Sequence, residues 1–141
     1  MSERSLTRAE AERRAALLSV ERYDIDVDLT DLPTGPEVRC VSTITFTCRE
    51  PGAETFVDCA AHVRDATLNG VALPPAEDGR IVLSGLAEHN TLRVASVQAD
   101  TTEGGGVHKA VDPADGEVYV WTTFEPDEAH QVWACFDQPD L

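Results

Sequence analysis

The most chemically suggestive part of the sequence is its last segment, residues 121 to 141, which reads WTTFEPDEAHQVWACFDQPDL. From residue 110 to the end there is no Lys or Arg, whereas eight carboxylates occur: Asp112, Asp115, Glu117, Glu125, Asp127, Glu128, Asp137 and Asp140. Such a field favours a cation or an amine as the ligand, if this segment binds one. The same charges could instead form a solvated acidic face that only aids solubility.

The charge of the whole chain restricts the classes of partner. The formal net charge is -15 and the sequence pI is about 4.4. Nucleic-acid binding depends on Lys and Arg that neutralise phosphates, so nucleic acid is excluded as a partner, and an anionic membrane surface is excluded for the same reason. The opening MSERSLTRAE has no apolar run like that of a secretory signal, and no stretch approaches the length of a membrane span. We therefore expect a cytoplasmic protein with no membrane partner.

Other candidate catalytic and metal-binding residues lack the spacing that their chemistry requires. Glu88 and His89 bring together the residue types that begin the zinc motif HExxH, but Arg93 stands four residues after His89. The stretch TTEGGGVHK has the glycines of a phosphate-binding loop without their arrangement, so it indicates a flexible connection. We expect no metal site in this chain.

The four cysteines are interpreted as core residues. They have neither CxxC spacing nor an extracellular context, which argues against a disulfide framework and against a four-cysteine zinc site. Cys135 lies in no signature of a catalytic cysteine. The sequence therefore predicts reduced, buried thiols at Cys40, Cys48, Cys59 and Cys135.

Two elements near the N-terminus are predicted from local pattern. Thr7 followed three residues later by Glu10 is a capping box, and it predicts a short helix from about Arg8 to Leu18. The stretch RYDIDVDL then alternates apolar and acidic residues, which predicts a strand with one buried face. The buried face would carry Tyr23, Ile25, Val27 and Leu29.

Further strands follow at short intervals. The stretch VRCVSTITFTC alternates with a period of two, so its apolar residues predict a buried face made of Val38, Cys40, Ile44, Phe46 and Cys48. Strand patterns recur in TFVDC, GRIVLSGL, NTLRVASVQA and EVYVWTTF. Asn69 and Gly70 predict a two-residue hairpin loop, and DPADGE predicts a tight turn. We expect one mainly β domain, an antiparallel sandwich or pair of strongly twisted sheets with one short N-terminal helix.

The stretch VDPADGEVYVWTTFEPDEAHQVWACFDQPDL resembles the N-terminal domain of the aminopeptidase N family of zinc metallopeptidases, which are gluzincins. Members of that family carry a pattern close to VDPxDGxxYxYTQFEPxDARRxFxCFDxPxLKA. The opening LTRAEAERRAALLSVERYDIDVDL and the stretches FTCREPGAETFVD and ATLNGVAL are similar to the bacterial branch. The resemblance covers essentially the whole chain.

The resemblance implies a specific role for the stretch TTFEP. In the family, the N-terminal domain is a β-rich saddle beside the active site, and its Glu at this turn binds the free α-amino group of a peptide substrate. That Glu corresponds to Glu125, and Thr123 takes the place of the family's Gln. The resemblance thus implies that Glu125 and Thr123 are substrate-binding residues. Asp137 is expected to be a scaffold acid that fixes a turn, while Trp133 and Phe136 pack behind Glu125.

The chain also departs from the family pattern. Trp121 replaces a Tyr, His130 and Gln131 replace an Arg pair, and Thr123 is too short to reach as Gln does. The zinc motif HExxH, its distant Glu ligand and the other catalytic residues lie in a following domain that this sequence does not contain. We therefore expect a domain cut short at its C-terminal end, with zinc only in the full-length parent and no catalysis by this chain alone. The alternative is a stand-alone noncatalytic binding module derived from that domain.

Overall fold

The computed structural model describes residues 4–98, 106–125 and 127–141. Helix α1 (Arg8–Leu17) opens the fold and leads directly into strand β1 (Leu18–Asp28). The predicted capping box is confirmed, because the Glu10 amide donates to Thr7 Oγ1 at 3.2 Å and the Thr7 amide donates to Glu10 Oε2 at 2.9 Å. No helix in the described part of the chain has the length and apolarity needed to cross a bilayer.

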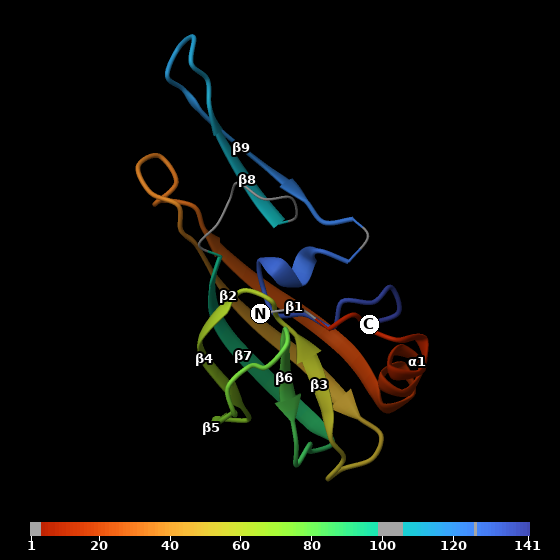
Figure 1. Cartoon of the computed structure of the whole chain (residues 1–141). Coiled ribbons are helices and arrows are strands. Elements are labelled where there is room, and N and C mark those ends of the chain that lie inside the picture. Colours follow the sequence, from red (N-terminus) through yellow and green to blue (C-terminus); the bar gives the residue numbers. More distant parts are fainter. Residues whose placement is uncertain (1–3, 99–105, 126) are drawn as a thin grey trace.

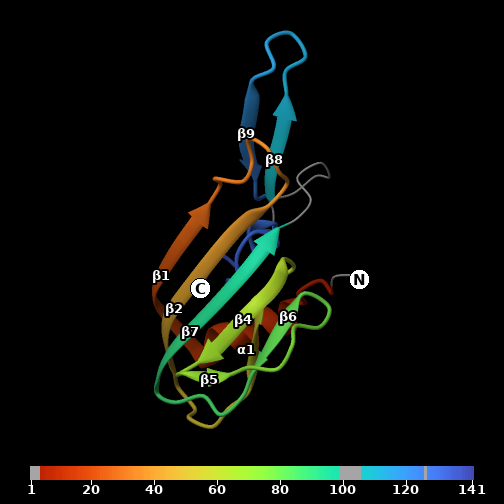
Figure 2. The ribbon, with the colours of Figure 1, turned by 90° about the vertical axis from the view of Figure 1, so that its left-hand side faces the viewer.

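A five-stranded antiparallel sheet forms the body, with the order β1, β2, β7, β4 and β5 (Figures 1 and 2). Its other strands are β2 (Val38–Cys48), β4 (His62–Leu68), β5 (Val71–Ala72) and β7 (His89–Gln98). A two-stranded sheet of β3 (Thr55–Asp58) and β6 (Arg80–Leu83) packs on one face of it. The prediction of a mainly β fold with one short N-terminal helix is confirmed.

The last part of the fold is a hairpin followed by an irregular segment. Strands β8 (Gly106–Val111) and β9 (Val118–Thr123) pair only with each other among the described residues, and the hairpin points away from the body (Figures 1 and 2). A short 3₁₀ helix, η1 (Ala129–Gln131), then leads back across the body. The turn predicted at DPADGE is confirmed, because it joins β8 to β9.

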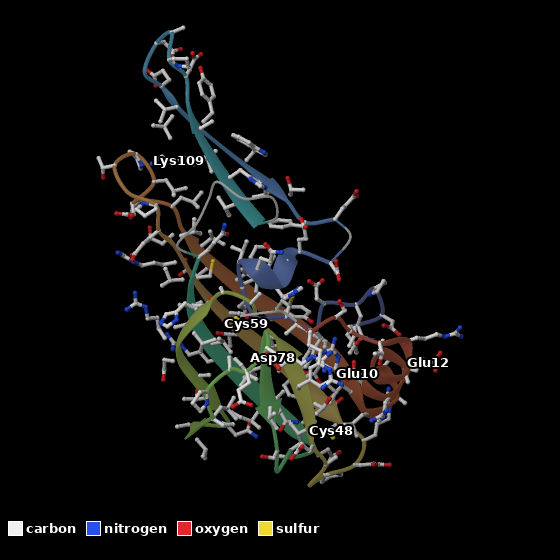
Figure 3. The ribbon with its side chains drawn as sticks, viewed as in Figure 1. Glu10, Glu12, Cys48, Cys59, Asp78 and Lys109 are labelled. Carbon is white, nitrogen blue, oxygen red and sulfur yellow. The ribbon has the colours of Figure 1, made fainter. Side chains whose placement is uncertain are left out.

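The main core lies between the large sheet and the small one. Phe46 of β2 meets Phe136 of the C-terminal segment edge to face, with ring centroids 5.4 Å apart. The face predicted for β2 is confirmed as buried. All four cysteines are free and buried, as predicted, and Figure 3 shows Cys48 and Cys59 in the body. Burial raises the pKa of Cys40 to about 11 and that of Cys59 to about 12.

The prediction for the first strand is only half right. Tyr23 and Ile25 are half-buried, but Val27 is 39% exposed, and Leu29 is 41% exposed and lies outside β1. Tyr23 packs against the main core, whereas Ile25, Val27 and Leu29 belong to neither apolar cluster of the described residues. Alternation in the sequence sets which face a side chain points to, but not whether that face is covered.

Of two loops predicted from the sequence, one is confirmed and the other is wrong at its end. Asn69 and Gly70 form the predicted hairpin loop between β4 and β5, with φ of 52° and 82°, as a type I′ turn requires. The flexible connection predicted for TTEGGGVHK is wrong at its end, because Gly106 begins strand β8. Residues 99–105 lie outside the described part of the chain. Pairing with β9 supplies the order that the local composition does not indicate.

Candidate functional site

The predicted substrate-binding residues lie where β9 ends. Thr123 is the last residue of the strand and is paired with Gly106 of β8. The base of the hairpin is fixed by Gln98, whose side chain receives the Val107 N–H at 3.1 Å and donates to the Val107 carbonyl at 3.0 Å. The end of β9 is therefore held at a defined place above the body.

The turn after β9 packs the Phe124 side chain against the fold and exposes the next one, Glu125. The Phe124 ring packs against Trp133, with ring centroids 5.1 Å apart, and both border a small apolar cluster that contains Val107 and Val132. The Phe124 carbonyl accepts the Glu128 N–H at 3.0 Å, which closes the turn. With Phe124 anchored inward, the Glu125 side chain is exposed.

The structure brings Thr123 and Glu125 together as exposed side chains on either side of Phe124. Among the described residues, Glu125 has no hydrogen-bond or ion-pair partner, so its carboxylate is available to a ligand. Trp133 does pack behind this turn, as expected. The same expectation for Phe136 is wrong, because Phe136 belongs to the main core and contacts Phe46.

Helix η1, which follows the turn, is held by an aspartate from the C-terminal segment. Asp137 Oδ2 accepts the His130 backbone N–H at 3.2 Å and lies 2.6 Å from His130 Nδ1. Burial alone would raise the pKa of Asp137, but the contacts with the His130 side chain and backbone outweigh it and hold the pKa below its ordinary value. The expectation that Asp137 is a scaffold acid is confirmed. The His130 carbonyl in turn accepts the Ala60 N–H at 2.8 Å.

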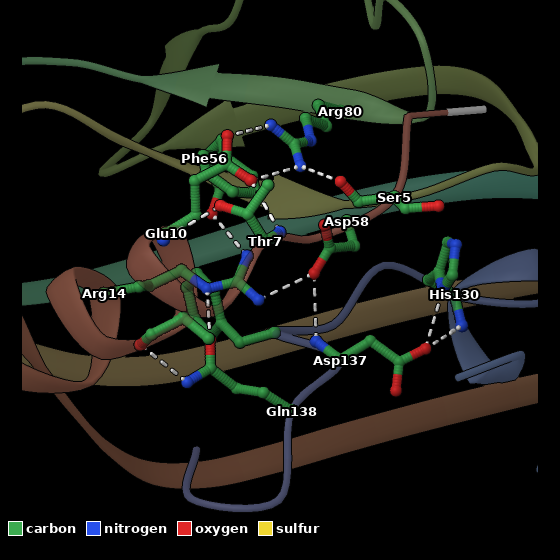
Figure 4. A network of polar contacts seen from close by, with 12 residues as sticks. Ser5, Thr7, Glu10, Arg14, Phe56, Asp58, Arg80, His130, Asp137 and Gln138 are labelled. Carbon is green, nitrogen blue, oxygen red and sulfur yellow. Dashed lines mark hydrogen bonds and ion pairs between the residues drawn. The ribbon is translucent and has the colours of Figure 1, made fainter. Parts of the chain in front are cut away.

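A buried arginine connects this segment to the helix (Figure 4). Arg14 of α1 is 1% exposed, and its guanidinium donates to Asp58 Oδ2 at 2.8 Å and to Gln138 Oε1 at 2.7 Å. Asp58 Oδ2 also accepts the Asp137 N–H at 3.1 Å. Asp58 forms a β-bridge with Cys135, so backbone and side chain fix the C-terminal segment to β3.

A second arginine completes the attachment of the helix. Arg80 of β6 donates to both carboxylate oxygens of Glu10, at 2.9 and 3.0 Å, and stacks over the Phe56 ring at 4.1 Å (Figure 4). The hydrogen bonds from Arg80 hold the pKa of Glu10 far below its ordinary value. Arg14 stacks over the same Phe56 ring at 4.7 Å. Sequence reasoning missed this network, because it gave Arg14 no role beyond the basic charge of the first stretch.

The described residues contain no cluster of three or more His, Cys, Asp or Glu side chains that could hold a metal ion. What the described chain offers is an exposed carboxylate on an anchored turn.

The chain is similar to known proteins in both sequence and fold. The sequence is 47% identical over 142 residues to aminopeptidase N of Streptomyces lividans, an alignment that covers 97% of this chain. The chain is a homologue of aminopeptidase N. It corresponds to the N-terminal portion of that M1 peptidase and spans 17% of the relative's length. No family model matches the sequence.

Solved structures show the same fold at low sequence identity. Yeast leukotriene A4 hydrolase in complex with bestatin matches 96% of this chain and 25% of its own, with a TM-score of 0.70 and 15% identity. An M1 zinc metallopeptidase from Deinococcus radiodurans, bound to a Tyr-Ser-Ala substrate, matches 87% of this chain and 30% of its own, with a TM-score of 0.59 and 19% identity. The aminopeptidase N homologue therefore has the β fold of the N-terminal region of these enzymes.

Proposed function

We propose that residues 1–141 form part of the N-terminal β domain of a zinc-dependent aminopeptidase, and that this domain caps the active site and binds the N-terminus of a peptide substrate. The homology to aminopeptidase N supports the class of substrate. The single observation that carries the residue assignment is the exposed, unpaired Glu125 carboxylate next to the half-buried Phe124, whose ring packs against Trp133.

Glu125 has the chemistry that a free α-amino group requires. An ammonium donating to a carboxylate forms a charge-assisted hydrogen bond, which is stronger than a neutral one and which an acylated amine does not form. The surrounding acidic residues, with no Lys or Arg from residue 110 onward, reinforce the attraction for a cation. Thr123 adds a hydroxyl that can accept a second N–H of the ammonium.

Hydrolysis itself needs groups outside the described residues. In the proposed parent enzyme, a zinc ion would polarise the scissile carbonyl and activate a water molecule. The contribution of this chain is to hold the amine end of the substrate, which fixes the distance from the N-terminus to the bond that is cut. This division of roles would make the parent an exopeptidase whose partners are peptide N-termini and its own catalytic domain.

A noncatalytic binding module is the second candidate. Thr123 and His130 stand where the family pattern has longer or more basic residues, which favours a weakened amine site. Sequencing the source reading frame past codon 141 separates the candidates. An HExxH motif with a downstream Glu in the same frame would support the aminopeptidase, whereas a stop codon after Leu141 would support the binding module.

The residue assignment is tested by kinetics of the full-length enzyme. We expect Glu125→Ala to lower kcat/KM for a free-amine peptide about tenfold to hundredfold, the effect of losing a hydrogen bond to a charged group. Glu117→Ala is the matched control, because Glu117 is an exposed acid at the far turn of the same hairpin. Equal kcat/KM values for both variants, with both folded, would remove Glu125 from the site.

We also propose a cytoplasmic location for the parent aminopeptidase. Fractionation of the source cells checks this. The protein is expected in the cytoplasmic fraction, and recovery from the culture medium or membranes would contradict it.

A further inference from the structure

We propose that His130 and Asp137 are positioning residues for Glu125, and that protonation of His130 tightens the turn that presents the Glu125 carboxylate. This inference rests on the proposed function, because it assigns a regulation to the same amine site. The family resemblance assigns no substrate contact to His130 or to Asp137.

The Glu125 turn is fixed at two ends. At the first end, Phe124 is held by its ring contact with Trp133 and by its carbonyl, which accepts the Glu128 N–H. At the second end, Glu128 caps η1, and its carbonyl accepts the Gln131 N–H at 3.1 Å. The orientation of Glu125 therefore depends on where η1 lies.

Helix η1 is too short to hold its own position. It has three residues and no side-chain cap at Glu128, so its place depends on contacts with the rest of the molecule. His130 provides those contacts, since it is 6% exposed, binds Asp137 through both its backbone N–H and Nδ1, and accepts the Ala60 N–H. Among the described residues, no other side chain of η1 has a hydrogen-bond or ion-pair partner.

Asp137 is itself held rigidly, so it can serve as a fixed reference for η1. Its N–H donates to Asp58 Oδ2, and Asp58 is paired with the buried Arg14. The chain of contacts thus runs from α1 through β3 to Asp137, then to His130 and the turn (Figure 4). A shift at any of these contacts would reach Glu125 through η1.

The His130 contact is the member of this chain that can change charge near neutral pH. Imidazole titrates between about pH 5 and 8, and a protonated ring makes a stronger, charge-assisted contact with a carboxylate than a neutral ring does. A small pocket of about 220 Å³ adjoins His130, and the other charged or titratable groups that line it are Arg4, Asp58, Asp127, Glu128 and Asp137.

Three substitutions separate the charge of His130 from its hydrogen bond. His130→Asn places an amide N–H near the Nδ1 position and so keeps a neutral donor. His130→Leu removes the donor. Asp137→Asn removes the charge of the acceptor. We expect kcat/KM for a free-amine peptide to fall about tenfold in His130→Leu at pH 8 and further at pH 6, where the charge-assisted contact is lost as well. In His130→Asn, the ratio of wild-type to variant kcat/KM should be close to one at pH 8 and grow as the pH falls to 6.

The closing experiment measures these ratios in the full-length enzyme, together with Glu125→Ala, and measures amide hydrogen exchange across residues 124–131. The result expected is a pH-dependent ratio for His130→Asn and faster exchange at Glu128 and Gln131 in His130→Leu. A large effect of Glu125→Ala with wild-type kinetics in all His130 variants would overturn the positioning role and leave the proposed function intact. No effect of Glu125→Ala would overturn both.

A purely structural role for His130 also has a distinct outcome. It would lower the stability of His130→Asn and His130→Leu while leaving the ratio of kcat/KM values constant from pH 6 to pH 8. That result would overturn the inference.

Discussion

The body of the molecule and the β8–β9 hairpin differ in which side chains they bury and which they expose. In the body, charged groups are buried in pairs, and Arg14 and Asp58 form an ion pair in which the side chains are 1% and 9% exposed. In the hairpin, aromatic residues face outward, and Tyr119 and Trp121 are 52% and 49% exposed. A hairpin that exposes such residues is typical of a surface that contacts another part of a protein or a partner.

This difference indicates which contacts fix the position of the Glu125 side chain. The body cross-links α1, β3, β6 and the C-terminal segment through directional contacts, which favour a single arrangement (Figure 4). The hairpin is anchored mainly at its base and points away from the body (Figure 2). Glu125 lies at the junction, next to the half-buried Phe124, so contacts with the body can position this exposed side chain.

The largest expected effect is on the body. Arg14→Ala leaves the Asp58 carboxylate buried without its partner, which costs about 3 to 5 kcal/mol of unfolding free energy. Arg8→Ala is the matched control, because Arg8 on the same helix is 90% exposed in its pair with Glu12, and such pairs contribute about 0.5 kcal/mol. Urea denaturation measures both. Similar losses for the two variants would contradict the contrast between body and surface.

A smaller effect is expected from acid. The folded-state pKa of Asp137 lies below its ordinary value, so the stability that this group contributes is present above the ordinary pKa of about 3.9 and is lost as the pH falls through the lowered value. Asp137→Asn should therefore cost about 1 to 2 kcal/mol at pH 7, and the deficit should shrink toward pH 2.

Denaturation curves at several pH values check this expectation. Asp26→Asn provides the control, because Asp26 is exposed on the edge strand β1. A deficit for Asp137→Asn that stays constant down to pH 2 would show that the carboxylate charge does not contribute to the stability of the fold.

The smallest effect is expected on the hairpin. Trp121 stacks on His108, with ring centroids 5.4 Å apart, but about half of its surface is already in contact with solvent. Trp121→Ser should change the unfolding free energy by about 0.5 kcal/mol, whereas Phe46→Ala in the core should cost about 3 to 5 kcal/mol. Thermal unfolding of the two variants gives the comparison. A loss for Trp121→Ser as large as that for Phe46→Ala would place the hairpin in the core.

Local patterns in the sequence predicted the parts of the fold that local physics decides. At the start of α1, the side chains of Thr7 and Glu10 each accept the backbone N–H of the other residue. At the β4–β5 turn, Asn69 and Gly70 adopt positive φ. The exposure of Val27 and the pairing of Gly106 in β8 were missed, because both depend on strands distant in sequence.

The sequence predicted only part of the candidate site. Every side chain of β9 from Tyr119 to Thr123 is exposed, so alternation does not single out Thr123, and the role proposed for Glu125 came from the family resemblance. The contact of His130 with Asp137 and the burial of Arg14 carry no local signal, since the partners lie on separate segments that only the fold brings together.

The most direct test of amine binding by Glu125 is a binding cycle in the proposed full-length aminopeptidase. It compares a peptide analogue that has a free α-amine with the same analogue lacking the amine, in the wild type, Glu125→Gln and Glu117→Gln. We expect the wild type and Glu117→Gln to prefer the free amine by about tenfold or more, and Glu125→Gln to lose this preference. An unchanged preference in Glu125→Gln would contradict the claim that this carboxylate binds the substrate amine.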